Sequence, residues 1–153
     1  MTADHHADQN RAFVLEEYAR LAPFYERKWS FYVRTTCRET LSRMHMTSKD
    51  SILDVGCGTG ALLHLLHTTL PDADLAGADP SPEMLTVARN RLPATIALKQ
   101  GWAEMIPFSS NTFDIVVSCN VFHYIRQPNE ALNELGRVLQ KGGQLGFTHR
   151  DDD

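Results

Sequence analysis

Residues 51–60 read Ser-Ile-Leu-Asp-Val-Gly-Cys-Gly-Thr-Gly, a short apolar run followed by three glycines at every second position. An apolar run of this length before a turn is typical of a strand buried on both faces of a parallel sheet. The glycines permit a turn that residues with a Cβ resist, and they let a ligand approach the backbone closely. Because an apolar, helix-like segment follows at residues 61–70, the stretch predicts a strand, a ligand-binding turn and a helix.

Strand and helix signals alternate through the rest of the chain. Further strands are predicted at residues 75–78, 95–98, 113–117 and 144–148, and further helices at residues 81–92 and 129–139. Ser81 before Pro82 is a helix start, and Gly142-Gly143 is interpreted as a helix C-terminal signal. Five strands alternating with helices specify an α/β fold: a Rossmann-like, doubly wound parallel sheet covered on both faces.

The segment before the first strand has helical periodicity. Apolar residues recur at helical spacing from Asn10 to Pro23, and a second stripe runs to about Met46. We expect two N-terminal helices there, packed as a lid or flank over the strand ends. Residues 1–9 are interpreted as a polar tail and residues 10–153 as a single domain, with 10–46 as the helical flank and 51–148 as the Rossmann-like core.

Composition narrows the class of protein. The chain has 153 residues, a formal charge of −4, 42% hydrophobic residues and 22% charged residues, which favour a folded globular protein. Mild acidity argues against nucleic acid as the main partner, and no apolar run approaches the roughly 20 residues that cross a bilayer. The three cysteines form no C-x-x-C pair, so neither a disulfide framework nor a metal site is indicated, and we expect a cytoplasmic protein.

In a doubly wound sheet the ligand lies beyond the carboxyl ends of the strands, where the strand order reverses. Asp54 stands at the end of the first strand, and Asp79 ends the second, 23 residues beyond Gly56. A carboxylate at this second position can accept hydrogen bonds from a ribose diol. The third and fourth strands end near Trp102 and Asn120. Glu104 is interpreted as a solvated loop charge, with a role in the site as the less favoured alternative.

Asp54 discriminates between candidate nucleotides. Gly56-x-Gly58-x-x-Ala61 also satisfies the dinucleotide fingerprint, so an NAD-dependent oxidoreductase is a possible interpretation. A carboxylate beside a pyrophosphate would be repelled, at a cost of about 1–4 kcal/mol for charges ~4 Å apart. Beside an ammonium and a sulfonium the same carboxylate is favourable. The residues therefore point to S-adenosylmethionine, which has a ribose and no phosphate.

Three motifs carry a family resemblance: Leu53-Asp-Val-Gly-Cys-Gly-Thr-Gly60, Asp79-Pro-Ser-Pro-Glu-Met84 and Ala103-Glu-Met-Ile-Pro-Phe108. They resemble the successive motifs of class I S-adenosylmethionine-dependent methyltransferases, above all the type 11 group, which includes enzymes similar to ubiquinone and menaquinone methyltransferases. The resemblance extends from about Tyr18 to Thr148. It implies methyl transfer to a small-molecule acceptor.

The resemblance also implies roles for individual positions. Backbone groups of Gly56, Cys57 and Gly58 would line the methionine part of the cofactor, and Asp54 would orient its ammonium. Asp79 would hold the ribose. The adenine would lie near Met84 or Pro80, beside the pair Trp102 and Ala103. Asn120 would supply a backbone contact after the fourth strand, while Tyr18 and Tyr25 would close over the cofactor.

Two departures from the family pattern qualify this picture. Relatives often carry, at position 102, an acidic residue that accepts from the adenine amino group; Trp102 would instead stack on the base or wall it off. The family sheet normally has seven strands, the last two an antiparallel hairpin, whereas this chain ends after the fifth. We therefore expect either an excised part of a longer protein or an exposed fifth strand that pairs in a homodimer or with a partner.

Methyl transfer needs a base only when the acceptor must lose a proton. His123 is the candidate because its pKa suits that task and it follows the fourth strand, although a packing role is at least as plausible from sequence. Besides the methyltransferase, a cofactor-binding but catalytically silent subunit or fragment stays open, and an NAD-dependent oxidoreductase is the least favoured reading. The acceptor itself is not encoded in these motifs.

Overall fold

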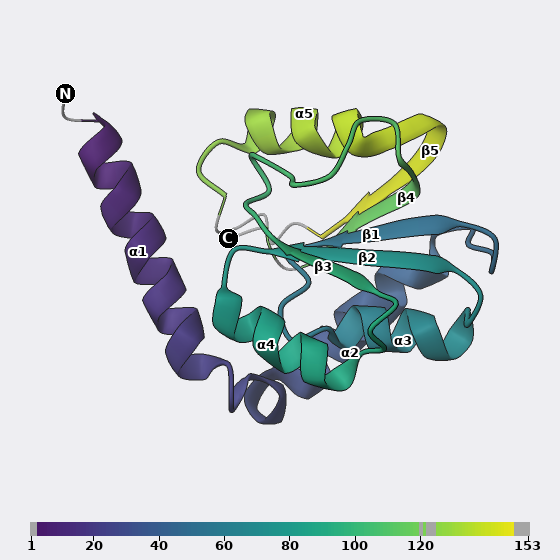
Figure 1. Cartoon of the computed structure of the whole chain (residues 1–153), viewed down its shortest axis with the longest axis horizontal. Coiled ribbons are helices and arrows are strands. Elements are labelled where there is room, and N and C mark those ends of the chain that lie inside the picture. Colours follow the sequence, from purple (N-terminus) through teal and green to yellow (C-terminus); the bar gives the residue numbers. More distant parts are fainter. Residues whose placement is uncertain (1–2, 120, 122–124, 149–153) are drawn as a thin grey trace.

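The computed structural model describes residues 3–119, 121 and 125–148 and contains five parallel strands with helices on both faces (Figure 1). The elements, in chain order, are α1 (Ala3–Leu21), α2 (Tyr25–Ser42), β1 (Ser51–Val55), α3 (Ala61–Thr69), β2 (Asp74–Asp79), α4 (Pro82–Arg91), β3 (Ala97–Gln100), β4 (Phe113–Ser118), α5 (Pro128–Val138) and β5 (Leu139–Phe147). This is the Rossmann-like doubly wound α/β fold that the sequence predicts.

The strands lie in the order β3-β2-β1-β4-β5. β1 pairs in parallel with β2 on one side and with β4 on the other, so the order reverses beside β1. A reversal of this kind leaves a crevice at the carboxyl ends of the two strands, because their following segments turn to opposite faces of the sheet. The topology thus directs the glycine turn after β1 into the ligand crevice.

Side chains of the central strands alternate between two hydrophobic layers. Ile52 packs under the face covered by α2, α3 and α4, while Leu53 and Val55 pack against α5 on the opposite face. All three are at most 1% exposed. Because both faces of β1 are covered, its apolar residues Ile52, Leu53 and Val55 occupy both faces of the strand rather than every second position. The burial of Leu53 and Val55 fixes the position of Asp54, which lies between these two residues in the strand.

The N-terminal helices differ in extent from the prediction. α1 begins at Ala3 rather than at Asn10, since no glycine or proline interrupts the chain before Pro23. α2 ends at Ser42, before the expected limit near Met46. A long-range contact holds the chain extended beyond it: His45 N donates to the Gln144 side-chain oxygen at 3.0 Å, and the Gln144 amide donates to His45 O at 2.6 Å.

Gly142-Gly143 was predicted to end a helix, and this is wrong. α5 ends at Val138 and β5 begins at the next residue, because the last carbonyls of α5 accept hydrogen bonds from the backbone N–H groups of Asn111 and Thr112. The two glycines lie instead in a bulge of β5, where Gly142 has φ +81°. A Cβ on Gly143 would stand 2.7 Å from Asp114 O. The glycines therefore serve the close approach of β5 to β4.

Two smaller observations complete the fold. β3 begins two residues later than predicted, because Ile96 N donates to Pro93 O at 3.1 Å and closes a turn there. β5 is the outermost strand on its side of the sheet, with Leu145 37% exposed. No helix in the described part of the chain is long and apolar enough to cross a membrane.

Candidate cofactor site

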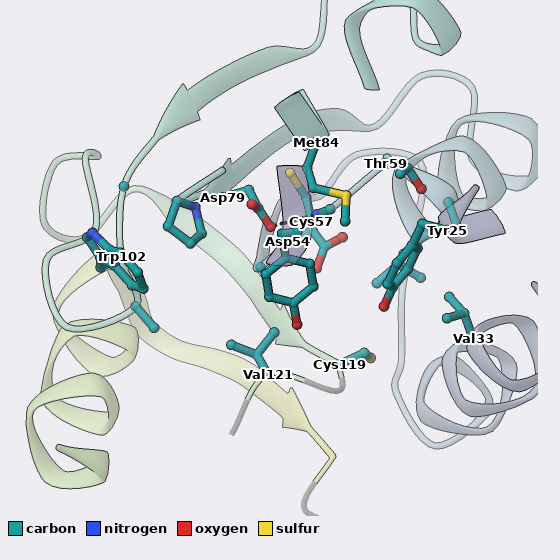
Figure 2. Close-up of a pocket in the computed structure, with 18 of the residues that line it drawn as sticks. Tyr25, Val33, Asp54, Cys57, Thr59, Asp79, Met84, Trp102, Cys119 and Val121 are labelled. Carbon is teal, nitrogen blue, oxygen red and sulfur yellow. Dashed lines mark hydrogen bonds between the residues drawn. The ribbon is translucent and has the colours of Figure 1, made fainter. Parts of the chain in front are cut away.

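A cavity of about 110 Å³ opens at the carboxyl ends of β1, β2, β3 and β4, and side chains from α1 and α2 complete its wall (Figure 2). Eleven residues predicted to bind the cofactor line it: Tyr18, Tyr25, Asp54, Gly56, Cys57, Gly58, Asp79, Pro80, Met84, Trp102 and Ala103. Asn120, the twelfth residue predicted to bind the cofactor, and His123, the candidate general base, lie outside the described residues. The fold thus brings the predicted set together, while the ligand group that each residue contacts stays a prediction.

The glycine turn folds back onto the end of β2. The N–H groups of Gly56 and Cys57 both donate to Ala78 O, at 2.7 and 3.0 Å. Gly56 has φ +77°, and a Cβ there would overlap the side chain of Val121. Gly58 has φ +52°, yet nothing lies within 4 Å of a Cβ built on it. Gly56 is thus required by packing, whereas Gly58 leaves open space on the cavity side of the turn.

Asp79 joins the glycine turn to the start of α4. Its Oδ2 accepts from Gly58 N and its Oδ1 from Ser81 N, both at 2.9 Å. The Ser81 hydroxyl in turn accepts from Met84 N at 3.2 Å, which is the expected N-cap of α4. Burial raises the pKa of Asp79, and the two backbone N–H groups oppose that rise. Each carboxylate oxygen has a second lone pair, so the group can still accept from a ribose diol.

Asp54 is a nearly inaccessible carboxyl group at the end of β1, with 2% of its surface exposed. Burial raises its pKa well above the ordinary range, and the neighbouring Cys119 and Asp79 add to the rise. A cation placed in the cavity would stabilise the ionised form and reverse part of this cost. Asp54 is therefore a group whose environment fits a positively charged ligand.

The charges around the cavity have one sign. Among the described residues, three carboxyl side chains line it, those of Asp54, Asp79 and Glu104, and no lysine, arginine or histidine does. A pyrophosphate would meet only repulsion from these side chains, whereas an ammonium and a sulfonium would be attracted. This set of carboxyl side chains therefore fits S-adenosylmethionine and disfavours NAD.

The third strand end forms one side of the cavity. Trp102 and Ala103 follow β3 in a turn closed by a 3.0 Å hydrogen bond from Met105 N to Trp102 O. The guanidinium carbon of Arg11, on α1, lies 4.9 Å from the centroid of the Trp102 ring. Trp102 thus both contacts the N-terminal flank and lines the cavity.

The opposite side of the cavity comes from α1 and α2. The rings of Tyr18 and Tyr25 are tilted against each other, with centroids 6.3 Å apart, and Val14 and Val33 also line the wall. Because these residues precede the first strand by more than 15 positions, the flanking helices are an integral part of the cavity. Whether they act as a lid or flank over a bound ligand stays a prediction.

Several lining residues were not in the predicted set. Glu104 was interpreted as a solvated loop charge, but it is half-buried and lines the cavity. Cys37 from α2 and Cys119 after β4 line it as well, so that together with the predicted Cys57 all three cysteines lie at the cavity. Burial raises the pKa of Cys57, so it stays a neutral thiol. Glu104 directly follows Trp102 and Ala103 in the sequence, and from this adjacency its position in the cavity wall could have been predicted.

Comparison with known proteins agrees with this geometry. Residues 53–147 match the family described as Methyltransferase domain. An uncharacterized methyltransferase of Mycobacterium tuberculosis is 43% identical over 97 residues, which are 63% of this chain and 38% of the relative. A demethylmenaquinone methyltransferase of Symbiobacterium thermophilum is 38% identical over 114 residues, 71% of this chain and 45% of the relative. The chain thus spans less than half the length of these two relatives.

Solved structures show the same fold. A chain from the complex between the Haloferax volcanii Trm112 methyltransferase activator and a candidate methyltransferase superposes with a TM-score of 0.79 at 28% identity, over 86% of this chain and 59% of the other. A Thermotoga maritima S-adenosylmethionine-dependent methyltransferase gives a TM-score of 0.72 at 24% identity, over 87% and 60%, which supports the fold alone.

The fold and the site define a class I S-adenosylmethionine-binding domain. The family match covers well over half of the chain, so the protein belongs to the S-adenosylmethionine-dependent methyltransferases, whose cofactor is S-adenosylmethionine.

Proposed function

We propose that this chain binds S-adenosylmethionine and transfers its methyl group to a small-molecule acceptor. The observation that carries the proposal is the charge of the cavity, where the lining described above supplies three carboxyl groups and no basic side chain. The cofactor, when bound, supplies a methyl group already activated on a sulfonium. The protein's task is then to hold and align this group and to exclude water, which contributes roughly 7–11 kcal/mol to such reactions.

Individual residues divide this task. Asp54 is proposed to accept from the cofactor's ammonium, and Asp79 from its ribose, while Gly58 gives the ligand access to the backbone. Tyr18 and Tyr25, whose tilted rings lie at the N-terminal wall, are proposed to keep water from the reacting centre. His123 remains a proposed general base for acceptors that must lose a proton.

Two relatives show why the acceptor is left at the level of a class. One is named a demethylmenaquinone methyltransferase and another, from Herminiimonas arsenicoxydans, a malonyl-[acyl-carrier protein] O-methyltransferase, at 38% and 43% identity. The acceptors in the two names differ in kind, although this chain matches 45% of the first protein and 36% of the second. A catalytically silent cofactor-binding subunit is the alternative interpretation from the sequence, and these comparisons do not favour it.

The test has two stages. Isothermal titration with S-adenosylhomocysteine, with NAD as the control ligand, measures the proposed cofactor preference. We expect micromolar binding of S-adenosylhomocysteine and none of NAD; the reverse would remove the proposal. The second stage follows S-adenosylhomocysteine formation from S-adenosylmethionine with a panel of small-molecule acceptors. Tight cofactor binding without turnover on any acceptor would favour the silent subunit.

The outer edge of β5 is the proposed place of association. β5 closes one side of the sheet and exposes Leu145, and an outermost strand of nine residues is a template for pairing with a further strand. The occupant is a second copy of the chain or another strand. Size-exclusion chromatography with light scattering tests the homodimer, and a stable monomer at high concentration would contradict it.

A further inference from the structure

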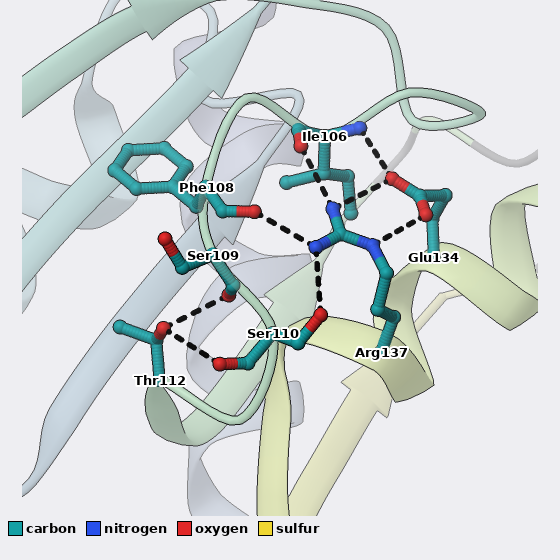
Figure 3. Close-up of polar contacts among 7 residues, drawn as sticks. All are labelled: Ile106, Phe108, Ser109, Ser110, Thr112, Glu134 and Arg137. Carbon is teal, nitrogen blue, oxygen red and sulfur yellow. Dashed lines mark hydrogen bonds and ion pairs between the residues drawn. The ribbon is translucent and has the colours of Figure 1, made fainter.

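A guanidinium on α5 is bonded to the backbone of the loop between β3 and β4. Arg137 Nη2 donates to Ile106 O at 2.9 Å, and Nη1 donates to Phe108 O at 3.0 Å and to the Ser110 hydroxyl at 3.2 Å (Figure 3). Residues 101–112 are called the β3–β4 loop below. One side chain thus satisfies three acceptors along five consecutive residues of this loop.

Glu134, one turn earlier on α5, completes the contact. Its Oε1 accepts from Arg137 Nε at 2.6 Å, and its Oε2 accepts from Arg137 Nη2 at 2.9 Å. The same Oε2 accepts from Ile106 N at 2.8 Å. The pair therefore bonds both the N–H and the carbonyl of Ile106, as a neighbouring strand would. Such a two-sided, charge-assisted contact fixes position better than a single ion pair does.

An ordinary surface ion pair would not have this geometry. Isolated Glu–Arg pairs three residues apart on a helix contribute little, because both side chains stay solvated. Here the side chains of Glu134 and Arg137 are only 21% and 34% exposed, and the guanidinium uses its fork for backbone acceptors as well. Lysine could not reproduce these contacts, because an ammonium lacks the planar fork.

The anchored loop carries one wall of the cavity. Trp102, Ala103 and Glu104 line the cavity, and Ile106 follows Glu104 with only Met105 between them. At its start the loop is held by a 3.1 Å hydrogen bond from Gly101 N to Asp79 O. A Cβ on Gly101 would stand 2.5 Å from Pro107 Cδ, so the two ends of the turn lie in contact. The turn that contains Trp102 and Ala103 is thus held on one side by the hydrogen bond to β2 and on the other by the contacts with α5.

We propose that Glu134 and Arg137 are positioning residues that hold Trp102 and Ala103 against the cofactor's adenine side, and so set cofactor affinity from the far face of the sheet. The inference rests on the proposed function. Neither residue lines the cavity, so the pair acts through the β3–β4 loop. Loss of the α5 anchor frees the turn to move while β2 still holds Gly101.

The test compares Arg137→Met, Arg137→Lys and Glu134→Gln with wild type. S-adenosylhomocysteine affinity is expected to fall by about tenfold in Arg137→Met, the loss that one misplaced hydrogen bond produces. Arg137→Lys is expected to resemble Arg137→Met rather than wild type.

The chain has two tryptophans, so in a Trp29→Phe background the fluorescence of Trp102 reports on the loop. Acrylamide quenching of Trp102 without ligand is expected to rise in Arg137→Met.

Gly136→Ala supplies the matched control on the same helix, because nothing lies within 4 Å of a Cβ at that position. It is expected to raise the melting temperature and to leave affinity and quenching unchanged. In the double variant Gly136→Ala/Arg137→Met, part of the lost melting temperature is expected to be recovered while S-adenosylhomocysteine affinity stays low.

A lower melting temperature of Arg137→Met with wild-type affinity and wild-type quenching would overturn the proposal. If wild type itself fails to bind S-adenosylhomocysteine, the proposed function fails, whereas the quenching comparison still decides whether the pair positions Trp102.

Discussion

The carboxylate of Asp79 accepts a 2.9 Å hydrogen bond from the backbone N–H of Gly58, so the end of β2 holds the turn that follows β1. The two residues are 21 positions apart in the sequence. The same side chain also accepts from Ser81 N, at the start of α4. A residue predicted to bind a ribose therefore first shapes the turn on which the rest of the cofactor would lie.

Asp79→Asn tests this double role. An asparagine has one oxygen acceptor where the aspartate has two, so its NH₂ group would face the N–H of Gly58 or of Ser81. We expect the free energy of unfolding to fall by about 1–3 kcal/mol, the cost of a buried donor left unsatisfied, and S-adenosylhomocysteine binding to be lost. Urea denaturation and titration calorimetry measure the two effects. Asp72→Asn, at an exposed carboxylate, is the control; equal losses in both variants would contradict the assignment.

The raised pKa of Asp54 predicts a pH dependence of stability. Its folded-state pKa lies above the unfolded value, so between the two the folded chain binds more protons. The contribution of this group to stability is therefore full below the unfolded pKa of about 4 and is lost as pH rises through the folded-state pKa. Asp54→Asn is expected to remove this loss and to make the ligand-free chain more stable at neutral pH, as denaturation at several pH values would show.

Cofactor binding is expected to lower the pKa of Asp54, which is opposite to the effect of burial. An ammonium beside Asp54 favours the carboxylate, so binding lowers the pKa of Asp54 and releases a proton where the free chain is protonated. Calorimetry in two buffers of different ionisation enthalpy measures this proton release, which should vanish in Asp54→Asn together with most of the affinity. Proton release of equal size in wild type and variant would rule out Asp54 as its source.

Gly58→Ala separates ligand access from folding. The positive φ of Gly58 makes alanine costly by about 1–2 kcal/mol, but no atom lies within 4 Å of the added Cβ. We expect a folded protein with moderately reduced stability and a large loss of S-adenosylhomocysteine affinity, because the methyl group enters the cavity. Gly56→Ala should instead fail to fold correctly, since its Cβ overlaps Val121. Circular dichroism and calorimetry on both variants distinguish the two; unchanged affinity in Gly58→Ala would count against the proposed cofactor path.

The cysteines offer a chemical test of the cavity without mutation. Cys119 is partly exposed, and a hydrogen bond from the Cys37 thiol lowers its pKa. Cys37 and Cys57 are buried, with raised pKa values. N-ethylmaleimide is therefore expected to label Cys119 first, and saturating S-adenosylhomocysteine to slow this labelling. Peptide mapping by mass spectrometry gives the site and the rate; labelling of Cys119 at the same rate with ligand would place it away from the bound cofactor.

Most of the fold and much of the cavity could be predicted from short segments. The apolar run 51–55, the glycine turn and Asp79 each carry a local signal, and eleven predicted residues meet in one cavity. Gly142-Gly143 was misread because a double glycine signals a helix end in isolation, whereas here pairing with β4 draws the chain directly from α5 into β5. Glu104 was misread because exposure of a loop carboxylate depends on where the loop packs.

The sequence by itself determined the order of strands and helices, the glycine turn after β1 and the acidic residues at two strand ends, because periodicity and residue chemistry act over a few positions. Only the tertiary structure decided what those residues meet. Gln144 bonds the backbone of His45 across 99 positions, and Glu134 bonds Ile106 across 28. Such contacts, like the absence of basic side chains from the described cavity lining, arise when distant segments pack together, and no local pattern encodes them.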